Sequence, residues 1–507
     1  MSKRRSSSTL KIREWDGYKE TAARLVVRVS YRPGYAVYLV RRFLALACLV
    51  ALALAAPAFG HAAEVSLTMD DGVHIDASLL VPPGAAPVGG WPAVMLFHRL
   101  GGNHTSLVGG LAPAYLGKGY AVFAPDARGH GTSGGYVSLD GPREVSDIRA
   151  EFQWLAARPE VSDTQIGAWG ISLGGGAAWN SVVAGVPFKA LETFETWSDL
   201  YGALFPQNLG KSGAIYNFAQ SVPTARIDPE LRPYVPQMIG NENLPAVRTL
   251  LGTRSSLNAL NAVTTPSFLF QGRRDFAFDI DQAAAAYRRL AGPKRLYVGD
   301  FGHQPSTFPG PDIAHVLELS TRWYDRFLKG IPNGVDKEKP VQIASNPWSQ
   351  KTASFAGLPA VKTLTLVSQV RSGLVARGKL VRTFALPKRS LEQFGAPVVR
   401  VTASTPTHWP HLVAVLTSVD ARGQETVLTE GGTITQFGSK ARTVSMKLIS
   451  TGNLIRPGSK LRVYLGGTST VQNVANLLYL KLVPDDSQLT VGKVTLTLPL
   501  LPKTISR

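Results

Sequence analysis

A serine placed at a sharp turn between a predicted strand and a predicted helix could carry out acyl transfer. Ser172 lies at the centre of Gly170-Ile-Ser-Leu-Gly174, where glycines on both sides let the backbone turn back closely on itself. Such an elbow exposes the hydroxyl at the start of the next helix, whose free N–H groups favour a developing oxyanion. The short apolar segment before the elbow and the small residues after it predict the strand and helix that it requires.

Two further residues, Asp275 and His303, could complete this chemistry. Each follows a short apolar segment that predicts a buried strand. The carboxyl ends of parallel strands meet at one edge of a sheet, so we expect both residues to lie beside Ser172. The chain order serine, aspartate, histidine is that of α/β-hydrolase triads, in which the imidazole takes the serine proton and the carboxylate orients the imidazole. Asp279 is a weaker rival for the acid role.

The loop His98-Arg-Leu-Gly-Gly102 follows another predicted strand and could build an oxyanion hole. Glycines after a strand end allow backbone N–H groups to point into a cleft. We expect the N–H groups of Leu100 and Leu173 to be the two donors. The alternative is a plain connecting loop.

The segments around these residues predict an α/β domain over residues 64–330. An opening hairpin precedes alternating strands and helices, the pattern of a mostly parallel sheet covered on both faces. The glycine-rich segment 125–134 lacks the lysine of a phosphate-binding loop, so its Asp126, Arg128 and Ser133 are expected to fix the loop by local hydrogen bonds.

The alternation is lost between about residues 197 and 262, which is too long for a plain connection. A helical cap over the serine would explain this segment. Its aromatic residues could form walls of a substrate pocket or belong to the core, and the candidates are Trp197, Tyr201, Phe205, Tyr216 and Phe218.

Residues 341–507 predict a C-terminal β-sandwich, after a polar linker that begins at Gly330. Almost every segment there alternates with a period of two, and Gly, Pro and Asp separate the segments, as in a jelly roll of the galactose-binding type. His408 and His411 could line a ligand groove, although a structural or surface role is the more ordinary reading.

Composition limits the class of partner. The 507 residues carry a formal charge of +19, but residues 1–63 hold eleven Lys or Arg and three acidic residues, which leaves +11 for the rest. No basic run with interleaved aromatic residues follows residue 63, so we expect a small-molecule substrate rather than nucleic acid. No spacing of histidines and carboxylates matches a zinc site, and no cofactor motif is present, so neither metal nor cofactor is expected.

Residues 1–63 predict an N-terminal extension with a signal peptide. The basic pair Arg41-Arg42 precedes the apolar run 43–56, which holds the only cysteine, Cys48, and small residues follow. The run is too short to span a bilayer comfortably. We therefore expect cleavage after Ala58 or Ala62, a periplasmic or secreted thiol-free protein with no membrane span, and a true translation start near residues 37–40.

Taken together, the motifs resemble those of the X-Pro dipeptidyl-peptidase and cocaine-esterase-like (CocE/NonD) hydrolases. The resemblance covers about residues 64–507 and rests on the serine elbow, Asp126-Ala-Arg-Gly129, Gly272-Arg-Arg-Asp275, Phe301-Gly-His303 and the helix end 323–330. It implies an α/β-hydrolase domain, a helical cap before the acid-bearing strand and a C-terminal jelly roll. Family members often use the hydroxyl of a tyrosine after the third strand as an oxyanion donor. In this chain the loop 98–102 occupies that position, which is closer to lipases and simple esterases.

Two substrate classes stay open for a serine hydrolase of this kind. An X-Pro dipeptidyl-peptidase must pair the ammonium group of its substrate, and Glu192, Glu195 and Asp199 could do so. The glycine-rich loop after His98 favours a carboxylic ester hydrolase instead. A non-catalytic carbohydrate-binding protein is a third and weaker alternative, because such a protein has no need of three matched catalytic groups.

Overall fold

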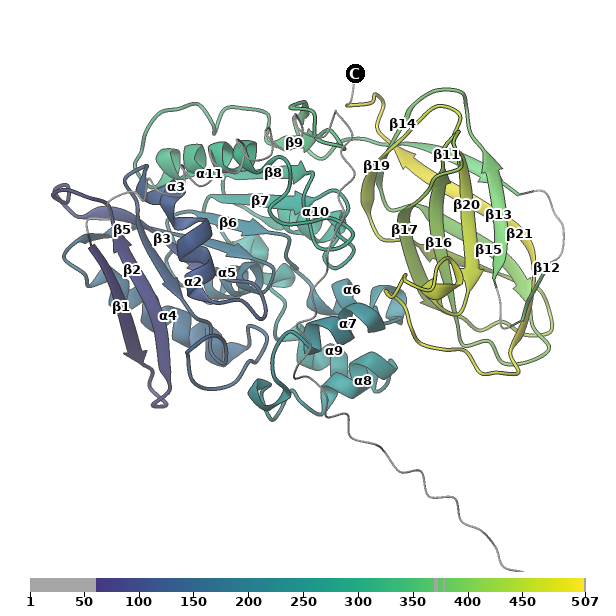
Figure 1. Cartoon of the computed structure of the whole chain (residues 1–507), viewed down its shortest axis with the longest axis horizontal. Helices are drawn as coiled ribbons and strands as arrows, with labels where there is room; N and C mark the ends of the chain where they lie inside the picture. The colour runs from purple at the N-terminus through teal and green to yellow at the C-terminus, as the bar shows by residue number, and fades with distance from the viewer. Residues whose placement is uncertain (1–60, 369–372, 377–378, 506–507) are drawn as a thin grey trace, which may run out of the picture. The chain divides into compact units, whose positions relative to one another are not determined.

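The computed structural model describes residues 61–368, 373–376 and 379–505 (Figure 1). The expected signal peptide, with Cys48 and the cleavage site after Ala58, lies outside the described residues. An N-terminal α/β region is followed by an all-β region, which confirms the fold class expected from the sequence.

A ten-stranded sheet forms the centre of the α/β region, in the order β1-β2-β4-β3-β5-β6-β7-β8-β9-β10. The strands from β3 to β9 run parallel, whereas β1, β2 and β10 pair antiparallel with their neighbours. The strand bounds are β1 (His61–Thr68), β2 (His74–Val81), β3 (Trp91–Phe97), β4 (Ala121–Pro125), β5 (Val161–Ile171), β6 (Leu191–Phe194), β7 (Ser267–Gly272), β8 (Lys294–Gly299), β9 (Val341–Ala344) and β10 (Thr352–Phe355).

One strand departs from the expected organisation. The segment Val341–Ala344, expected as the first strand of the C-terminal sandwich, is β9 and pairs in parallel with β8. Three of its four residues are buried, as the interior of a parallel sheet requires. The apolar alternation of a short strand does not show which sheet it joins.

Helices cover both faces of this sheet. Buried apolar residues of α4 (Pro142–Ala156), α5 (Leu173–Val183) and α10 (Ile280–Arg289) pack on one face. Those of α2 (His104–Gly110), α3 (Ala112–Leu116) and α11 (Ile313–Phe327) pack on the other. Both faces of the central strands are therefore dry, which explains their nearly continuous apolar sequences.

Short helices form the cap between β6 and β7, and α6 to α9 gather in one group (Figure 1). Their bounds are α6 (Leu200–Leu204), η1 (Pro206–Asn208), α7 (Ser212–Ala219), η2 (Thr224–Arg226), α8 (Tyr234–Gly240), α9 (Leu244–Gly252) and η3 (Leu257–Ala262). Their apolar residues share a core with Leu173, Ala277 and Phe278, so the cap packs directly onto the region around Ser172.

The all-β region consists of two antiparallel sheets that share one apolar core. The larger sheet contains β11 (Lys362–Val367), β12 (Gly373–Ala376), β14 (Leu391–Gly395), β15 (Val398–Ser404), β18 (Arg442–Lys447), β19 (Thr451–Ile455) and β21 (Gln488–Leu500). The smaller one contains β13 (Leu380–Ala385), β16 (His411–Val419), β17 (Glu425–Ile434) and β20 (Lys460–Gly466), and the helical turn η4 (Ser469–Val471) follows it.

A buried arginine connects the two regions beside the acid-bearing loop. Arg273, directly after β7, forms a fully buried ion pair with Glu392 of β14 and donates a hydrogen bond to the Ala344 carbonyl. The Gly452 N–H donates to the Arg273 carbonyl at 2.7 Å. The loop that follows β7 is therefore anchored on both sides.

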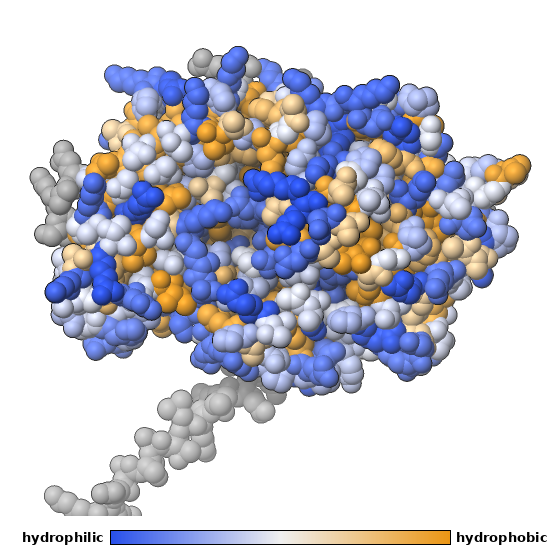
Figure 2. Space-filling view, turned by 180° about the vertical axis from the view of Figure 1, so that it is seen from behind, coloured by the Kyte–Doolittle hydropathy of each residue, from blue (hydrophilic) through white to orange (hydrophobic). Residues whose placement is uncertain are grey.

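The surface seen in Figure 2 intersperses hydrophilic and hydrophobic side chains. Within the described part of the chain, no helix has the length and apolar character needed to cross a membrane.

Candidate active site

Ser172 occupies a strained turn between β5 and α5. Its backbone has φ 55° and ψ −116°, an unfavourable conformation for a residue with a side chain. A Cβ at Gly170 would lie 2.0 Å from the Gly174 carbonyl oxygen, and one at Gly174 would lie 2.1 Å from that of Phe97. Both glycines are therefore required by close packing, and the Ser172 N–H is fixed on the Phe194 carbonyl at 2.9 Å.

The structure brings Ser172, Asp275 and His303 together in one hydrogen-bonded chain. The Ser172 hydroxyl lies 3.0 Å from His303 Nε2, and His303 Nδ1 lies 2.7 Å from Asp275 Oδ2. Nδ1 therefore donates to the carboxylate, which leaves Nε2 free to accept the serine proton. The residues follow β5, β7 and β8 at the same edge of the sheet, as the strand pattern predicts.

Asp275 is held rigidly by its own loop. Its Oδ1 accepts from the backbone N–H groups of Ala277 and Phe278, both at 2.9 Å, and its Oδ2 also accepts from the His303 N–H at 3.2 Å. Lys211 of the cap, which is 1% exposed, donates to the carbonyls of Phe276 and Ala277 in this loop at 2.9 Å each.

The pKa of His303 is set by competing effects. Burial lowers it, but the charge of Asp275 and its hydrogen bond to Nδ1 outweigh burial, and the charge of Glu195 adds to them, so that the pKa is raised to about 9. Arg99 opposes this rise. The arrangement therefore stabilises the imidazolium form of His303.

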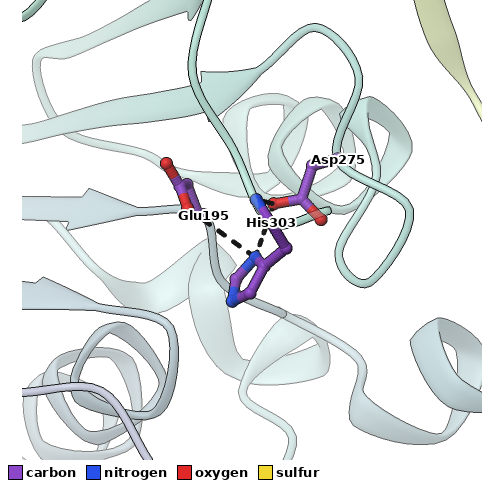
Figure 3. Close-up of side chains that lie close together, drawn as sticks. All are labelled: Glu195, Asp275 and His303. Atoms are coloured by element: carbon purple, nitrogen blue, oxygen red, sulfur yellow. Dashed lines mark hydrogen bonds and ion pairs between the residues drawn. The ribbon is translucent and has the colours of Figure 1, made fainter. Parts of the chain in front are cut away.

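A second carboxyl group, that of Glu195, faces the same ring nitrogen (Figure 3). Its Oε2 lies 3.7 Å from His303 Nδ1, and its Oε1 is buried without a hydrogen-bond partner among the described residues. Burial raises the pKa of Glu195 well above its usual value, and the charges of Asp275 and Asp312 raise it further, while His303 lowers it. The sequence suggested Glu195 only as a partner for a substrate ammonium group.

Glu195, Asp275 and His303 also form the one group of described residues whose types and proximity would suit a metal ion. The four hydrogen bonds that Asp275 accepts commit both of its oxygens to His303 and to the backbone. The hydrogen bonding therefore fits a proton relay better than a metal centre.

Both expected oxyanion donors lie at the cavity that contains Ser172. Leu173 is the first residue of α5, so its N–H has no acceptor within the helix. Leu100 lies in a loop held by His98, whose Nδ1 contacts the Arg99 carbonyl at 2.8 Å and whose Nε2 accepts from the Ala127 N–H at 2.9 Å. Their role as donors stays a prediction.

The cavity beside Ser172 is lined almost entirely by apolar side chains. It holds about 740 Å³ of empty space, a figure that includes space open to solvent. The serine is joined there by Leu100, Val137, Leu139, Leu173, Trp197, Leu200, Leu204, Ile215, Phe218, Ala219, Val222, Ile227, Leu231, Val235, Met238 and Phe278. Among the residues that the structure describes, none with a carboxylate side chain lines this cavity.

The aromatic residues that the sequence offers as candidate pocket walls lie in different places. Trp197 and Phe218 line the cavity with Ser172. Tyr201 and Phe205 stack on each other at 5.1 Å between ring centroids and line a different, polar cavity. Tyr216 is half exposed and lines neither cavity.

The remaining acidic candidates lie away from the serine cavity. Glu192 is fully buried and accepts a hydrogen bond from Ser320 at 2.6 Å. Asp199 caps α6 by accepting from the Gly202 N–H. Asp279, the rival acid, accepts from the Ser450 N–H at 2.9 Å and has no hydrogen bond with His303 among the described contacts.

The glycine-rich loop and the two histidines of the all-β region lie outside the candidate site. Asp126 accepts from the N–H groups of His104 and Thr132, Arg128 pairs with Asp147, and Ser133 donates to the Asp126 carbonyl, so the glycine-rich loop is held locally. In the all-β region, His411 is buried, with Nε2 2.9 Å from the carbonyls of Gly467 and Lys481, whereas His408 is exposed.

Known proteins resemble this chain in sequence and in fold. Residues 71–305 match the X-Pro dipeptidyl-peptidase (S15 family), a range that contains Ser172, Asp275 and His303. A putative Xaa-Pro dipeptidyl-peptidase of Streptomyces avermitilis is 24% identical over 268 residues, which are 47% of this chain and 38% of that protein. The chain thus spans well under half the length of that curated relative.

Solved structures resemble both regions together. A CocE/NonD family hydrolase from Staphylococcus aureus superposes with a TM-score of 0.68 and 15% identity, over 87% of this chain and 94% of that one. An α-amino acid ester hydrolase gives a TM-score of 0.66 and 14% identity, over 88% and 98% of the two chains. These likenesses establish a shared fold. The α/β region of this chain is therefore related to the X-Pro dipeptidyl-peptidase (S15) family of hydrolases, as its motifs implied.

Proposed function

We propose that this protein is a serine hydrolase that cleaves carboxylic esters with uncharged, apolar acyl groups through an acyl-enzyme on Ser172. The observation that carries the proposal is the hydrogen-bonded chain of Ser172, His303 and Asp275 at the edge of an apolar cavity. His303 accepts the serine proton and later returns it to the leaving alcohol, and a water molecule then releases the acid by the reverse sequence. The N–H groups of Leu100 and Leu173 are the proposed oxyanion donors.

An X-Pro dipeptidyl-peptidase is the second candidate, favoured by the family match over residues 71–305. Such an enzyme must pair the ammonium group of its substrate, because a buried unpaired charge costs several kcal/mol. Among the described residues that line the serine cavity, none is acidic. Glu192, Glu195 and Asp199 do not line this cavity, so the cavity supports the ester substrate more strongly.

The decisive test compares two chromogenic substrates at the same pH. We expect a higher kcat/KM for 4-nitrophenyl hexanoate than for glycyl-prolyl-4-nitroanilide, and Ser172→Ala should abolish the hydrolysis of both. A higher kcat/KM for the peptide, lost in Glu195→Gln or Glu192→Gln, would overturn the ester assignment.

The acyl cavity itself can be tested by filling it. Ala219 lines the cavity, whereas Ala225, in the neighbouring turn η2, is exposed. Ala219→Phe should lower the ratio of hexanoate to acetate hydrolysis by about tenfold or more, since each excluded methylene loses about 1 kcal/mol of binding. Ala225→Phe is the matched control and should leave the ratio unchanged. An unchanged ratio in Ala219→Phe would place the acyl chain elsewhere.

We further propose that the protein is exported by the signal peptide within residues 1–63 and that its all-β region is a jelly roll. Cleavage after Ala58 would leave β1 intact, whereas cleavage after Ala62 would remove its first two residues. The intact mass of the protein recovered from the periplasm or medium should correspond to one of these sites. A full-length cytoplasmic species alone would contradict export.

A further inference from the structure

We propose that Glu195 is a second positioning residue for His303, able to hold the Nδ1 hydrogen when Asp275 does not. This inference rests on the proposed function, because it gives Glu195 a role in the relay that ends at Ser172. The two acidic residues follow different strands: Glu195 comes directly after β6, and Asp275 follows β7 after two intervening residues.

The geometry places both carboxyl groups against the same atom. Asp275 Oδ2 lies 2.7 Å and Glu195 Oε2 lies 3.7 Å from His303 Nδ1, and Figure 3 shows the two contacts converging on that nitrogen. A shift of about 1 Å would bring Glu195 to hydrogen-bond distance. The Ser172 hydroxyl contacts Nε2 on the other edge of the ring, so a change of acid at Nδ1 leaves the serine contact in place.

The surroundings of Glu195 argue against a purely structural role. It is 2% exposed, and its Oε1 has no hydrogen-bond partner among the described residues, although burying an unpaired polar atom costs about 1–3 kcal/mol. Its backbone also has φ 47°, which is strained for a residue with a side chain. The ion-pair contact of this carboxyl group is with His303 Nδ1, so its neighbour is the ring that contacts Ser172.

Electrostatics explain why Glu195 is neutral while Asp275 is charged. Glu195 faces His303, Asp275 and Asp312, and burial together with the two aspartates favours its neutral form by raising its pKa, while His303 lowers it. His303 in turn faces Asp275, Glu195 and Arg99. Removing the charge of Asp275 removes one repulsion from Glu195, so Glu195 ionises more easily and can pair with the imidazolium.

A double-mutant cycle tests this role. Turnover of 4-nitrophenyl hexanoate is measured for the native full-length chain, Glu195→Gln, Asp275→Ala and the double variant. We expect Glu195→Gln alone to lower kcat less than about threefold, because Asp275 still holds Nδ1. In the Asp275→Ala background the same change should lower kcat by about a further tenfold or more, because Glu195 is then the acid that holds Nδ1.

Glu192→Gln is the matched control, because Glu192 is equally buried, lies three residues earlier and contacts Ser320 instead of His303. It should have the same effect in both backgrounds. Equal effects of Glu195→Gln in the two backgrounds would overturn the proposal. If the native chain shows no turnover that depends on Ser172, the proposed function is refuted instead.

A measurement that needs no turnover covers the case in which Asp275→Ala does not fold. The chain has nine histidines, so the ring signal of His303 can be assigned by its absence in His303→Ala and titrated by NMR. In an Asp275→Asn background, which keeps the shape of the side chain but removes its charge, Glu195→Gln should lower the pKa of His303, because ionised Glu195 then supports the imidazolium, and Glu192→Gln should not. An unchanged pKa of His303 when Glu195→Gln is added to that background would also overturn the proposal.

Discussion

The cap has two faces that line cavities of opposite character. The cavity beside Ser172 is apolar apart from the serine itself. The second cavity, which we call the polar cavity, lies among the cap, the α/β region and the all-β region and is lined by Asp199, Tyr201, Gly202, Ala203, Phe205, Pro206, Gln207, Asn208, Lys211, Arg248, Asp279, Asp281, Gln282, Lys447, Leu448, Ile449 and Tyr479. The two cavities therefore offer a substrate different groups, because of these two Ser172 lines only the apolar one.

The short helix α6 shows how one segment serves both cavities. Leu200 and Leu204, four residues apart, face the serine cavity. Tyr201 and Phe205, also four residues apart, stack on each other and face the polar cavity. Residues four apart lie on the same side of a helix. The second pair starts one residue after the first, so the two pairs face different neighbours.

The largest effects should come from the groups at the apolar cavity. Ser172→Ala should abolish labelling by a fluorophosphonate probe, and Asp275→Ala or His303→Ala should each lower kcat by about 10³-fold or more, because the three groups act together. Labelling and steady-state kinetics check this. A chelator should leave activity unchanged, and unchanged turnover in His303→Ala would refute the assignment of the triad.

The pH dependence of catalysis should come from the same cavity. His303 accepts the serine proton only when it is neutral, and its pKa is raised to about 9. We therefore expect kcat/KM to rise by about 10²-fold between pH 7 and pH 9 and to level off above that. A profile that is flat across this range would show that His303 is already neutral at pH 7.

The sequence predicts the proximity of Ser172, Asp275 and His303 better than it predicts the cap. Ser172, Asp275 and His303 follow from strand ends and one tight turn, which are local patterns, and the observed distances bring these residues together. Tyr201 was expected as a candidate wall of the substrate pocket but faces the polar cavity, because the direction of a five-residue helix depends on tertiary packing. The contact of Glu195 with His303 joins segments more than one hundred residues apart, and no local pattern encodes it.

The polar cavity should govern stability rather than chemistry. Glu430, in β17 near this cavity, has a pKa raised to about 7 by burial, although its hydrogen bonds with Ser469 and Asn476 and the charge of Lys211 oppose this rise. The folded state therefore binds a proton more tightly than the unfolded state, and this group's contribution to the free energy of unfolding falls as pH rises from about 4.5 to 7.

The expected fall is about 2–3 kcal/mol and should disappear in Glu430→Gln. Urea unfolding at pH 4.5 and pH 7 measures it. An identical pH dependence in the native chain and the variant would contradict the assignment.

The smallest expected effect tests a contact that joins the polar cavity to the loop of Asp275. Lys211 lines the polar cavity and donates to the carbonyls of Phe276 and Ala277, whose loop holds Asp275. Lys211→Met keeps the length of the side chain but removes both donors, so the loop should loosen and kcat should fall by up to about tenfold with little change in KM.

Lys447→Met is the matched control for this last change. Lys447 lines the same cavity, but its side chain is 58% exposed and pairs with Asp281 at 2.5 Å, away from the loop of Asp275. An exposed ion pair contributes about 0–1 kcal/mol to stability, so this variant should keep the native kcat. If both lysine variants lower kcat equally, the polar cavity as a whole supports catalysis. If only Lys211→Met does, the effect passes through the backbone of the Asp275 loop.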